Sequence, residues 1–384
     1  MRPLPAPLRA AARRVPRTPE ALARLIAALP KVETHLHLDG AVSAETAARL
    51  AADAPGSPLR GLPVEEVRRR VVVDRPRAAL PEVLAAFGAF YPLLRSAAAV
   101  ELVAYELLRE AARQNVLYSE VRFAPVLQAA EGFPPEAALD AALRGLSRGR
   151  ADFGADSGVI ICLLRPFSAV SREDNAAMAA LAVSRAGRGV VGLDVADAGA
   201  GDARLADYGP WFQAARAAGL GLTAHAGEAG RPGELEDALA LGVDRIGHGV
   251  ALRESPALRA EVRRRGIFVE ANPTSNLRTG AVSSYAAHPL KSWREEGLAV
   301  AVSTDDPGVF GVDLNHEYEV LARELGFGPE DLLEVAWAGV ESAFVPAAER
   351  RALAERFEER ARAALESPFP AGRTRSTSER PRRP

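Results

Sequence analysis

From residue 31 onward, short apolar runs alternate with longer segments whose apolar residues recur at helical spacing. Strands that alternate with helices form parallel sheets, and eight such units make a (β/α)8 barrel, whose usual size suits this chain. An open, doubly wound sheet is the alternative, but no strand-like run leads into a Gly-x-Gly-x-x-Gly turn or a phosphate loop. The sequence therefore predicts an α/β fold of the TIM-barrel type. The eight strand-like runs are 31–37, 116–123, 159–164, 190–195, 221–225, 245–248, 267–270 and 298–303.

The barrel is expected to occupy residues 20–366, with extra helices after the first strand and at the carboxyl terminus. Residues 43–115 hold far more helical pattern than one crossover needs, including a predicted helix over 80–94. Part of this insertion is therefore expected to form a lid over the end of the first strand. The flanking residues 1–19, rich in Ala, Arg and Pro, and 367–384, rich in Arg, Pro, Ser and Thr, are predicted to be flexible tails.

The net charge and the hydropathy pattern limit the classes of partner. A formal net charge of -2 supplies no basic field, and no apolar run approaches the roughly 20 residues of a membrane span. We therefore expect no binding to nucleic acid or membrane, and an enzyme or binding protein for a small molecule. The one cysteine, Cys162, lies in an apolar run, so a buried thiol without an intrachain disulfide is expected, in a cytoplasmic protein. The oligomeric state is not predicted.

Histidines gather where the predicted strands end. His35 and His37 lie two residues apart on the first strand, so their side chains point to the same face. Of six histidines in the chain, four follow this placing, since His225 ends the fifth strand and His248 ends the sixth. The carboxyl ends of barrel strands meet at one rim, where TIM-barrel enzymes carry their chemistry. The sequence therefore predicts a functional metal site there.

Neutral imidazoles with one carboxylate suit zinc, and a catalytic site leaves a position for water. The predicted ligands are His35, His37, His225 and Asp305. We expect one ion, because two-metal barrels of this type use a modified lysine at the end of the fourth strand. The two lysines of the chain, Lys31 and Lys291, both lie far from that strand.

Three further polar residues remain beside the predicted metal, namely Glu228, His248 and Asp306. Glu228 follows His225 by three residues, where it could exchange a proton with a substrate, or instead support a ligand histidine. His248 lies between two glycines and could orient the metal-bound water, or instead act as a fifth ligand.

Six blocks of sequence carry a family resemblance. They are PKVETHLHLDG at 30–40, YSEVRFAP at 118–125, TAHAGE at 223–228, GHG at 247–249, PTSNL at 273–277 and STDDP at 303–307. In this order, over about residues 29–344, they resemble the adenosine deaminase family of the amidohydrolase superfamily. The run 84–92 is similar to the helical lid of that family. Zinc deaminases of the other type need paired cysteines, which this chain lacks.

The resemblance implies zinc-dependent hydrolytic deamination of a 6-aminopurine nucleoside, such as adenosine or deoxyadenosine, to the 6-oxo product and ammonia. It implies that His248 and Asp305 orient the water that attacks C6, that Glu228 protonates N1, and that Asp306 hydrogen-bonds N7. The implied catalytic residues are thus Glu228, His248 and Asp305. The implied substrate contacts are His37, Asp39, Asp197 and Asp306.

Two of these substrate contacts bear on which nucleoside is bound. Asp39 resembles the residue that receives the ribose 5′-hydroxyl in nucleoside deaminases of the family, although it could instead only cap the turn at Gly40. Asp197 replaces the family glycine whose N–H meets the purine N3, and its side chain would add bulk and charge to the pocket. It could recognise a substituent that adenosine lacks.

Other functions remain open at this point. The substrate could be free adenine or a modified adenosine such as aminodeoxyfutalosine. The chain could instead be a monozinc amidohydrolase or lactonase, or a nucleoside-binding protein without catalysis.

Overall fold

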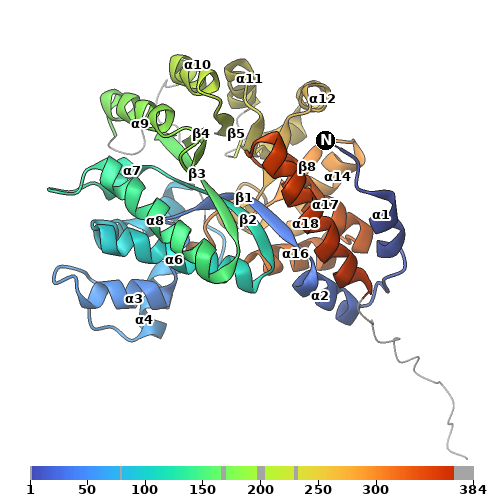
Figure 1. Cartoon of the computed structure of the whole chain (residues 1–384), viewed down its shortest axis with the longest axis horizontal. Coiled ribbons are helices and arrows are strands. Elements are labelled where there is room, and N and C mark those ends of the chain that lie inside the picture. The colour runs from blue at the N-terminus through green and yellow to red at the C-terminus, as the bar shows by residue number, and fades with distance from the viewer. Residues whose placement is uncertain (1, 78–79, 166–169, 197–203, 229–231, 367–384) are drawn as a thin grey trace, which may run out of the picture.

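The computed structural model describes residues 2–77, 80–165, 170–196, 204–228 and 232–366. At the centre of these residues lies an eight-stranded parallel sheet whose strands neighbour one another in chain order (Figure 1). Its strands are buried on both faces, as in all-parallel sheets, and β2 is buried at every residue. The strands are β1 (Lys31–His37), β2 (Val116–Phe123), β3 (Asp156–Leu164), β4 (Val190–Ala196), β5 (Gly221–Ala226), β6 (Arg245–His248), β7 (Phe268–Ala271) and β8 (Ala299–Val302).

The sheet closes on itself where the end of β8 meets β1. Leu36 forms a parallel bridge with Asp305. The His37 N–H donates to the Asp305 carbonyl at 2.8 Å, and the Asp305 N–H donates to the His35 carbonyl at 3.1 Å. The predicted (β/α)8 barrel is therefore confirmed, and its closing contacts join residues at the rim expected to carry the chemistry.

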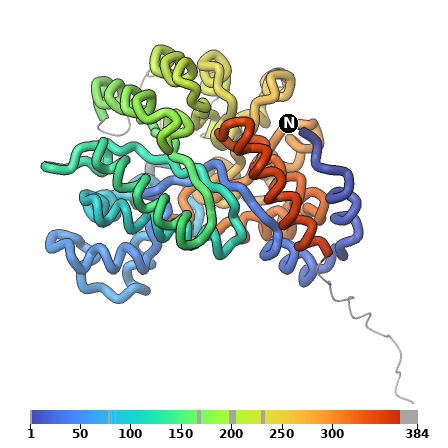
Figure 2. Tube along the Cα trace, in the orientation of Figure 1, coloured from blue at the N-terminus to red at the C-terminus, as the bar shows by residue number. Residues whose placement is uncertain are grey.

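Helices surround the barrel and connect its strands (Figure 2). Several begin with capping residues that satisfy the free N–H groups of the first turn, such as the reciprocal Ser171–Asp174 capping box of α9. The helices are α1 (Ala6–Ala12), α2 (Pro19–Ala28), α3 (Ala44–Ala52), α4 (Val64–Val71), α5 (Leu80–Leu84), α6 (Ala97–Arg113), α7 (Pro125–Gln128), α8 (Pro135–Phe153), α9 (Arg172–Ser184), α10 (Gly209–Ala217), α11 (Pro232–Leu241), α12 (Pro256–Arg265), α13 (Pro273–Arg278), α14 (Leu290–Glu295), α15 (Pro307–Phe310), α16 (Leu314–Arg323), α17 (Pro329–Ser342) and α18 (Ala347–Glu366).

The insertion after β1 contains α3 to α5, and α3 and α4 stand away from the barrel at the lower left of Figure 2. The predicted single helix over 80–94 is wrong. After α5 the chain continues as two 3₁₀ segments, Ala85–Ala89 and Tyr91–Leu94. Gly88 is a poor helix former and Pro92 lacks the N–H that an α-helix needs, so neither supports one continuous helix.

The predicted flexible tail over residues 1–19 also needs correction. Residues 6–12 form α1, which packs against α17 and α18 and buries Leu8 and Ala12 (Figure 1). Leu4, Leu8 and Ala12 recur every four residues and so share one face of a helix. The prolines lie beside α1 or in its first turn, where the missing N–H costs nothing. The second predicted tail, 367–384, lies outside the described residues.

Two further predictions concern membrane-spanning helices and the single cysteine. None of the helices in the described part of the chain is both long and apolar enough to cross a membrane. Cys162 is a free, buried cysteine on β3, as predicted.

Candidate active site

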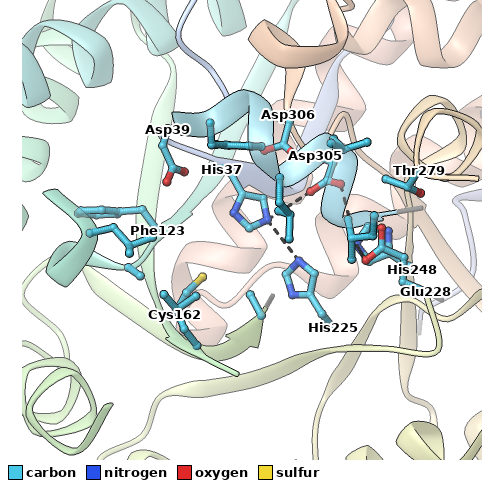
Figure 3. Close-up of a pocket in the computed structure, with 18 of the residues that line it drawn as sticks. His37, Asp39, Phe123, Cys162, His225, Glu228, His248, Thr279, Asp305 and Asp306 are labelled. Atoms are coloured by element: carbon cyan, nitrogen blue, oxygen red, sulfur yellow. Dashed lines mark hydrogen bonds and ion pairs between the residues drawn. The ribbon is translucent and has the colours of Figure 1, made fainter. Parts of the chain in front are cut away.

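Histidines from three strands and an aspartate after a fourth converge at the carboxyl end of the barrel. His35 and His37 come from β1, His225 from β5 and His248 from β6, while Asp305 follows β8. Figure 3 shows His37 and His225 pointing toward each other, with Asp305 above them and His248 beside Glu228. The structure therefore brings the four predicted ligands to one point.

The distances among these ligand atoms suit a metal ion. His35 Nε2 and His37 Nε2 lie 3.1 and 3.2 Å from Asp305 Oδ1. His37 Nε2 lies 3.2 Å from His225 Nε2. Ligands around a tetrahedral zinc ion with bonds of about 2.0–2.1 Å are about 3.3 Å apart. His35 Nε2 and Asp305 Oδ1 are buried without a hydrogen-bond partner among the described residues. Two buried ligand atoms that lack a hydrogen-bond partner and face the same point are suited to bind a cation.

The geometry allows more than one grouping of ligands. The ligand atoms of His35, His225, His248 and Asp305 all lie within 4.8 Å of one another, and so do those of His37, Asp305 and Asp306. Since both groups include Asp305, the two arrangements describe one site. They differ in whether His248 or His37 completes it.

The Nδ1 atoms of two of the predicted ligand histidines, His35 and His225, are held by buried carboxylates. His35 Nδ1 lies 2.6 Å from Glu270 Oε2, and His225 Nδ1 lies 3.0 Å from Asp194 Oδ2. Ser275 Oγ donates to Asp305 Oδ2 at 2.7 Å. A carboxylate at Nδ1 holds the ring proton there, so that the Nε2 lone pair faces the site.

Glu270 belongs to a fully buried ion network inside the barrel. Its Oε2 lies 3.0 Å from Arg122 Nη2, and its Oε1 lies 2.5 Å from Arg245 Nε. Arg122 also pairs with Asp194 at 2.9 Å, and Arg245 with Glu120 at 2.6 Å. Burial alone would raise the pKa of Glu270, but Arg122 and Arg245 hold that pKa below its usual range. The carboxylate behind His35 is therefore a fixed negative charge.

Glu270 and Asp194 are not among the site residues predicted from the sequence. The available signal was a single carboxylate within each of two apolar strands, β4 and β7. A charged residue in a buried parallel strand must be paired, so such residues can be flagged even though their partners cannot.

Glu228, the predicted proton donor, is buried and lies beside this cluster of potential metal ligands. Its Oε2 is 3.7 Å from His248 Nε2. Burial raises the pKa of Glu228 to about 8, and the negative charge of Asp305 adds to this shift. Burial, followed by the charges of Asp305 and Asp39, also raises the pKa of Asp306 well above its usual range. These raised pKa values favour the protonated forms of both carboxyl groups, which can donate a hydrogen bond.

Uncommon backbone geometry directs two of these side chains, and a glycine makes room for a third. His248 has φ 61° and Asp305 has φ 66°, in the left-handed region that non-glycine residues rarely adopt. Asp306 packs directly on Gly40, where a Cβ atom would lie 1.8 Å from Asp306 Oδ1. Gly40 is therefore required for Asp306 to face the site.

A cleft opens above the cluster and extends under the inserted segment after β1. The inserted residues Val83, Leu84, Phe87 and Tyr91 line it, which agrees with the predicted lid. Asp39 lies on the side of Phe123 in Figure 3, is buried, and hydrogen-bonds the Tyr91 side chain. Four acidic residues and no lysine or arginine occur among the described residues that line the cleft. These four are Asp39, Glu228, Asp305 and Asp306.

The predicted site residues therefore divide in two. His35, His37, Asp39, His225, Glu228, His248, Asp305 and Asp306 all lie at this cleft or at the cluster beneath it. Asp197 lies outside the described residues. The individual roles of these residues remain predictions.

Known proteins resemble this chain over most of its length. The sequence model of the family described as adenosine deaminase matches residues 30–360. An adenosine deaminase of Klebsiella pneumoniae (strain 342) is 35% identical over 336 residues, which cover 85% of this chain and 97% of that protein.

Solved structures of similar fold include an amidohydrolase from Burkhoderia ambifaria with bound Zn. That structure has a TM-score of 0.78 and 28% identity, covering 90% of this chain and 95% of that one. The adenine deaminase from Arthrobacter aurescens has a TM-score of 0.74 and 26% identity, covering 86% of this chain and 98% of that one.

Proposed function

Since the chain belongs to the adenosine deaminase family and is therefore a hydrolytic deaminase, we propose that it converts a 6-aminopurine nucleoside to the 6-oxo product and ammonia. The observation that carries this proposal is the convergence of His35 Nε2 and Asp305 Oδ1, both buried and without a hydrogen bond among the described residues, beside Glu228, a buried carboxyl group whose pKa is raised to about 8. Hydrolytic deamination needs a cation that activates water and a group that protonates the substrate, and this arrangement could supply both.

We propose one zinc ion as the cofactor, held by His35, His37, His225 and Asp305. The donor set of three neutral imidazoles and one carboxylate supports zinc over magnesium or calcium, which prefer oxygen ligands. Bound there, zinc would supply a water molecule whose pKa is lowered toward about 7, so that hydroxide is available at neutral pH.

Three side chains would then bind the purine and donate protons or hydrogen bonds during the reaction. Glu228 donates a proton to the ring N1, which makes C6 more electrophilic. Asp306 donates its proton in a hydrogen bond to N7, an acceptor, which requires the neutral form that its raised pKa supports. His248, whose Nε2 lies 3.9 Å from Asp305 Oδ2, would stabilise the charge that develops on the attacking oxygen.

The acidic cleft supports a nucleoside over a nucleotide. A 5′-phosphate would face Asp39 with no lysine or arginine among the described lining residues, whereas a 5′-hydroxyl can donate to Asp39. Free adenine has no 5′-hydroxyl to donate to Asp39. The preference for a substituent at Asp197 remains a separate expectation. The buried, unpaired Cys162 supports a cytoplasmic location.

A substrate panel tests the proposal. Zinc-loaded protein is assayed for ammonia release and change of ultraviolet absorbance with adenosine, deoxyadenosine, adenine, AMP and aminodeoxyfutalosine. We expect turnover of the nucleosides and little of AMP. Failure with every aminopurine, or turnover of cyclic amides or lactones alone, would refute it.

The variant Glu228→Gln tests the proton donor. We expect kcat to fall by about 10²- to 10⁴-fold with unchanged zinc content, because the amide cannot protonate N1. Glu236 on α11 is an exposed glutamate eight residues further on, so Glu236→Gln is the matched control and should keep full activity.

A further inference from the structure

His288 is a buried histidine that the proposed reaction does not use. It follows the 3₁₀ segment Tyr285–Ala287 and is 3% exposed. Its Nδ1 lies 3.1 Å from the backbone nitrogen of Leu290. A backbone N–H can only donate, so Nδ1 must be the acceptor. Burial lowers the pKa of His288 to about 3, so the ring is neutral. Its single ring proton is therefore on Nε2.

This proton determines how the neighbouring amide of Asn276 is oriented. His288 Nε2 lies 3.0 Å from Asn276 Oδ1, which accepts the hydrogen bond. The amide nitrogen must then point the other way. There, Asn276 Nδ2 lies 3.0 Å from His248 Nδ1. An amide nitrogen has no lone pair to offer, so His248 Nδ1 is the acceptor in this contact.

We infer that His288 and Asn276 are positioning residues that keep the proton of His248 on Nε2, so that this nitrogen enters the active site as a hydrogen-bond donor. His248 Nε2 lies 3.7 Å from Glu228 Oε2 and 3.9 Å from Asp305 Oδ2, which places it between the two groups. Three hydrogen bonds thus form a relay that runs from the Leu290 N–H through His288 and Asn276 to His248. Each bond fixes the orientation or the tautomer of the next side chain.

The tautomer of His248 decides what this residue can do. With a proton on Nε2 it has no lone pair facing the cluster, so it is not a metal ligand, although its position alone would allow it. It also cannot take a proton from water through that atom. It can donate a hydrogen bond to the oxygen that attacks the substrate, which stabilises developing negative charge. This inference deepens the proposed function and depends on it only where kinetics are used.

A second amide competes for His248 Nδ1. The Asn272 side chain is 3.3 Å from it. Asn272 satisfies the Ser303 and Ala271 carbonyls when its nitrogen faces them, and its oxygen then faces His248 Nδ1 at 3.3 Å. That oxygen favours a proton on Nδ1. Backbone groups fix both amides, but the Asn276 contact is the shorter, at 3.0 Å against 3.3 Å, so we assign the proton to Nε2.

The direct test is nitrogen NMR of the zinc-loaded protein with ¹⁵N-labelled histidine. A protonated ring nitrogen and one with a free lone pair have well-separated shifts, and the chain has only six histidines. The His248 signals are assigned by their loss in His248→Gln. We expect a protonated Nε2 and a lone pair on Nδ1. The opposite pattern would overturn the inference, and this readout involves no substrate.

The variant Asn276→Asp reverses the polarity of the contact at nearly constant shape. Both carboxylate oxygens are acceptors, so the proton of His248 should move to Nδ1, and the NMR pattern should invert. We expect kcat to fall by about 10²-fold or more, as when one preorganised donor is lost, with KM changing less than about 3-fold. A variant that keeps both the wild-type tautomer and wild-type kcat would contradict the relay.

Variants of His288 keep the inference testable if Asn276→Asp does not fold. His288→Gln places an amide nitrogen near the former Nε2 position and should keep the tautomer and activity. His288→Phe leaves Asn276 Oδ1 without its donor, and we expect mixed His248 tautomers and a lower kcat. Equal behaviour of Gln and Phe at this position would show a merely structural role. His316 on α16 has an Nε2 without a hydrogen-bond partner among the described residues, so His316→Gln is the control.

Discussion

Glu270 and Glu317 are two fully buried glutamates with opposite surroundings. Glu270 contacts Arg122, Arg245, Thr223 and His35 at 2.5 to 3.1 Å. Glu317 forms no ion pair with any described residue and accepts a hydrogen bond from the Thr274 N–H at 3.2 Å. Burial raises the pKa of Glu317 to about 8, whereas the pKa of Glu270 lies below its usual range. At pH 6 the carboxyl group of Glu317 is therefore neutral and that of Glu270 is charged.

Replacing each residue by glutamine should have very different costs. Glu270→Gln removes the charge that Arg122 and Arg245 share, and breaking a buried pair on one side costs about 3–5 kcal/mol. Asp194 and Glu120 remain as second partners of the two arginines, so the cost should not double. Glu317→Gln keeps an acceptor for Thr274 and changes no charge, so about 1 kcal/mol or less is expected. Against a total stability of about 5–15 kcal/mol the difference is large.

The assay is urea unfolding of the metal-free proteins at pH 6, followed by circular dichroism. Because the folded-state pKa of Glu270 is depressed, its contribution is present above about pH 4.3 and is lost as the pH falls through the folded value. The two variants should therefore converge at low pH. Glu270→Gln should also weaken zinc binding by about 10- to 100-fold, since Glu270 orients His35. Equal losses of unfolding free energy at pH 6, within about 1 kcal/mol, would refute the assignment of charge.

Three shorter predictions follow from other parts of the molecule. Leu8→Ala should lower the unfolding free energy by about 2–4 kcal/mol, because α1 packs on the barrel helices, and exposed Ala10 replaced by Ser should cost far less. Burial lowers the pKa of Lys31 to about 7, so between about pH 7 and pH 10 the unfolded chain binds more protons and stability should rise with pH; Lys31→Met should remove this rise in urea titrations. A chelator should abolish deamination, and added zinc should restore it, with far-ultraviolet circular dichroism unchanged because Glu270 and Asp194 still hold the ligand histidines.

Local pattern predicted the frame of this molecule well where strands and helices are regular. β6 runs over Arg245–His248 as predicted, and β1 and β2 have their predicted bounds. Apolar runs bounded by turns are a strong signal for buried parallel strands. The segment 80–94 was harder, because its apolar spacing fits a helix while Gly88 and Pro92 break one. The high proline content around α1 is typical of a flexible tail, and it outweighs the helical spacing of Leu4, Leu8 and Ala12 in a prediction from sequence.

The site was predicted through residue type and strand end, and its support was not. His35, His37, His225 and Asp305 converge because barrel topology sends strand ends to one rim. The partners of Glu270 lie 148 and 25 residues away in the chain, at Arg122 and Arg245. No local pattern joins residues at such separations. The same holds for the His288 and Asn276 contacts, which depend on which edge of a ring faces which atom.

The left-handed backbone of His248 and Asp305 sets a limit on how this protein can be engineered. Each such residue costs about 1–3 kcal/mol, which a glycine would not incur. A laboratory selection for heat resistance alone would therefore favour glycine at two positions whose side chains lie in the candidate active site. Thermal stability and catalytic activity therefore make opposite demands at these two positions. Stabilising substitutions should instead be made away from the site, for instance at the contact between α1 and α18.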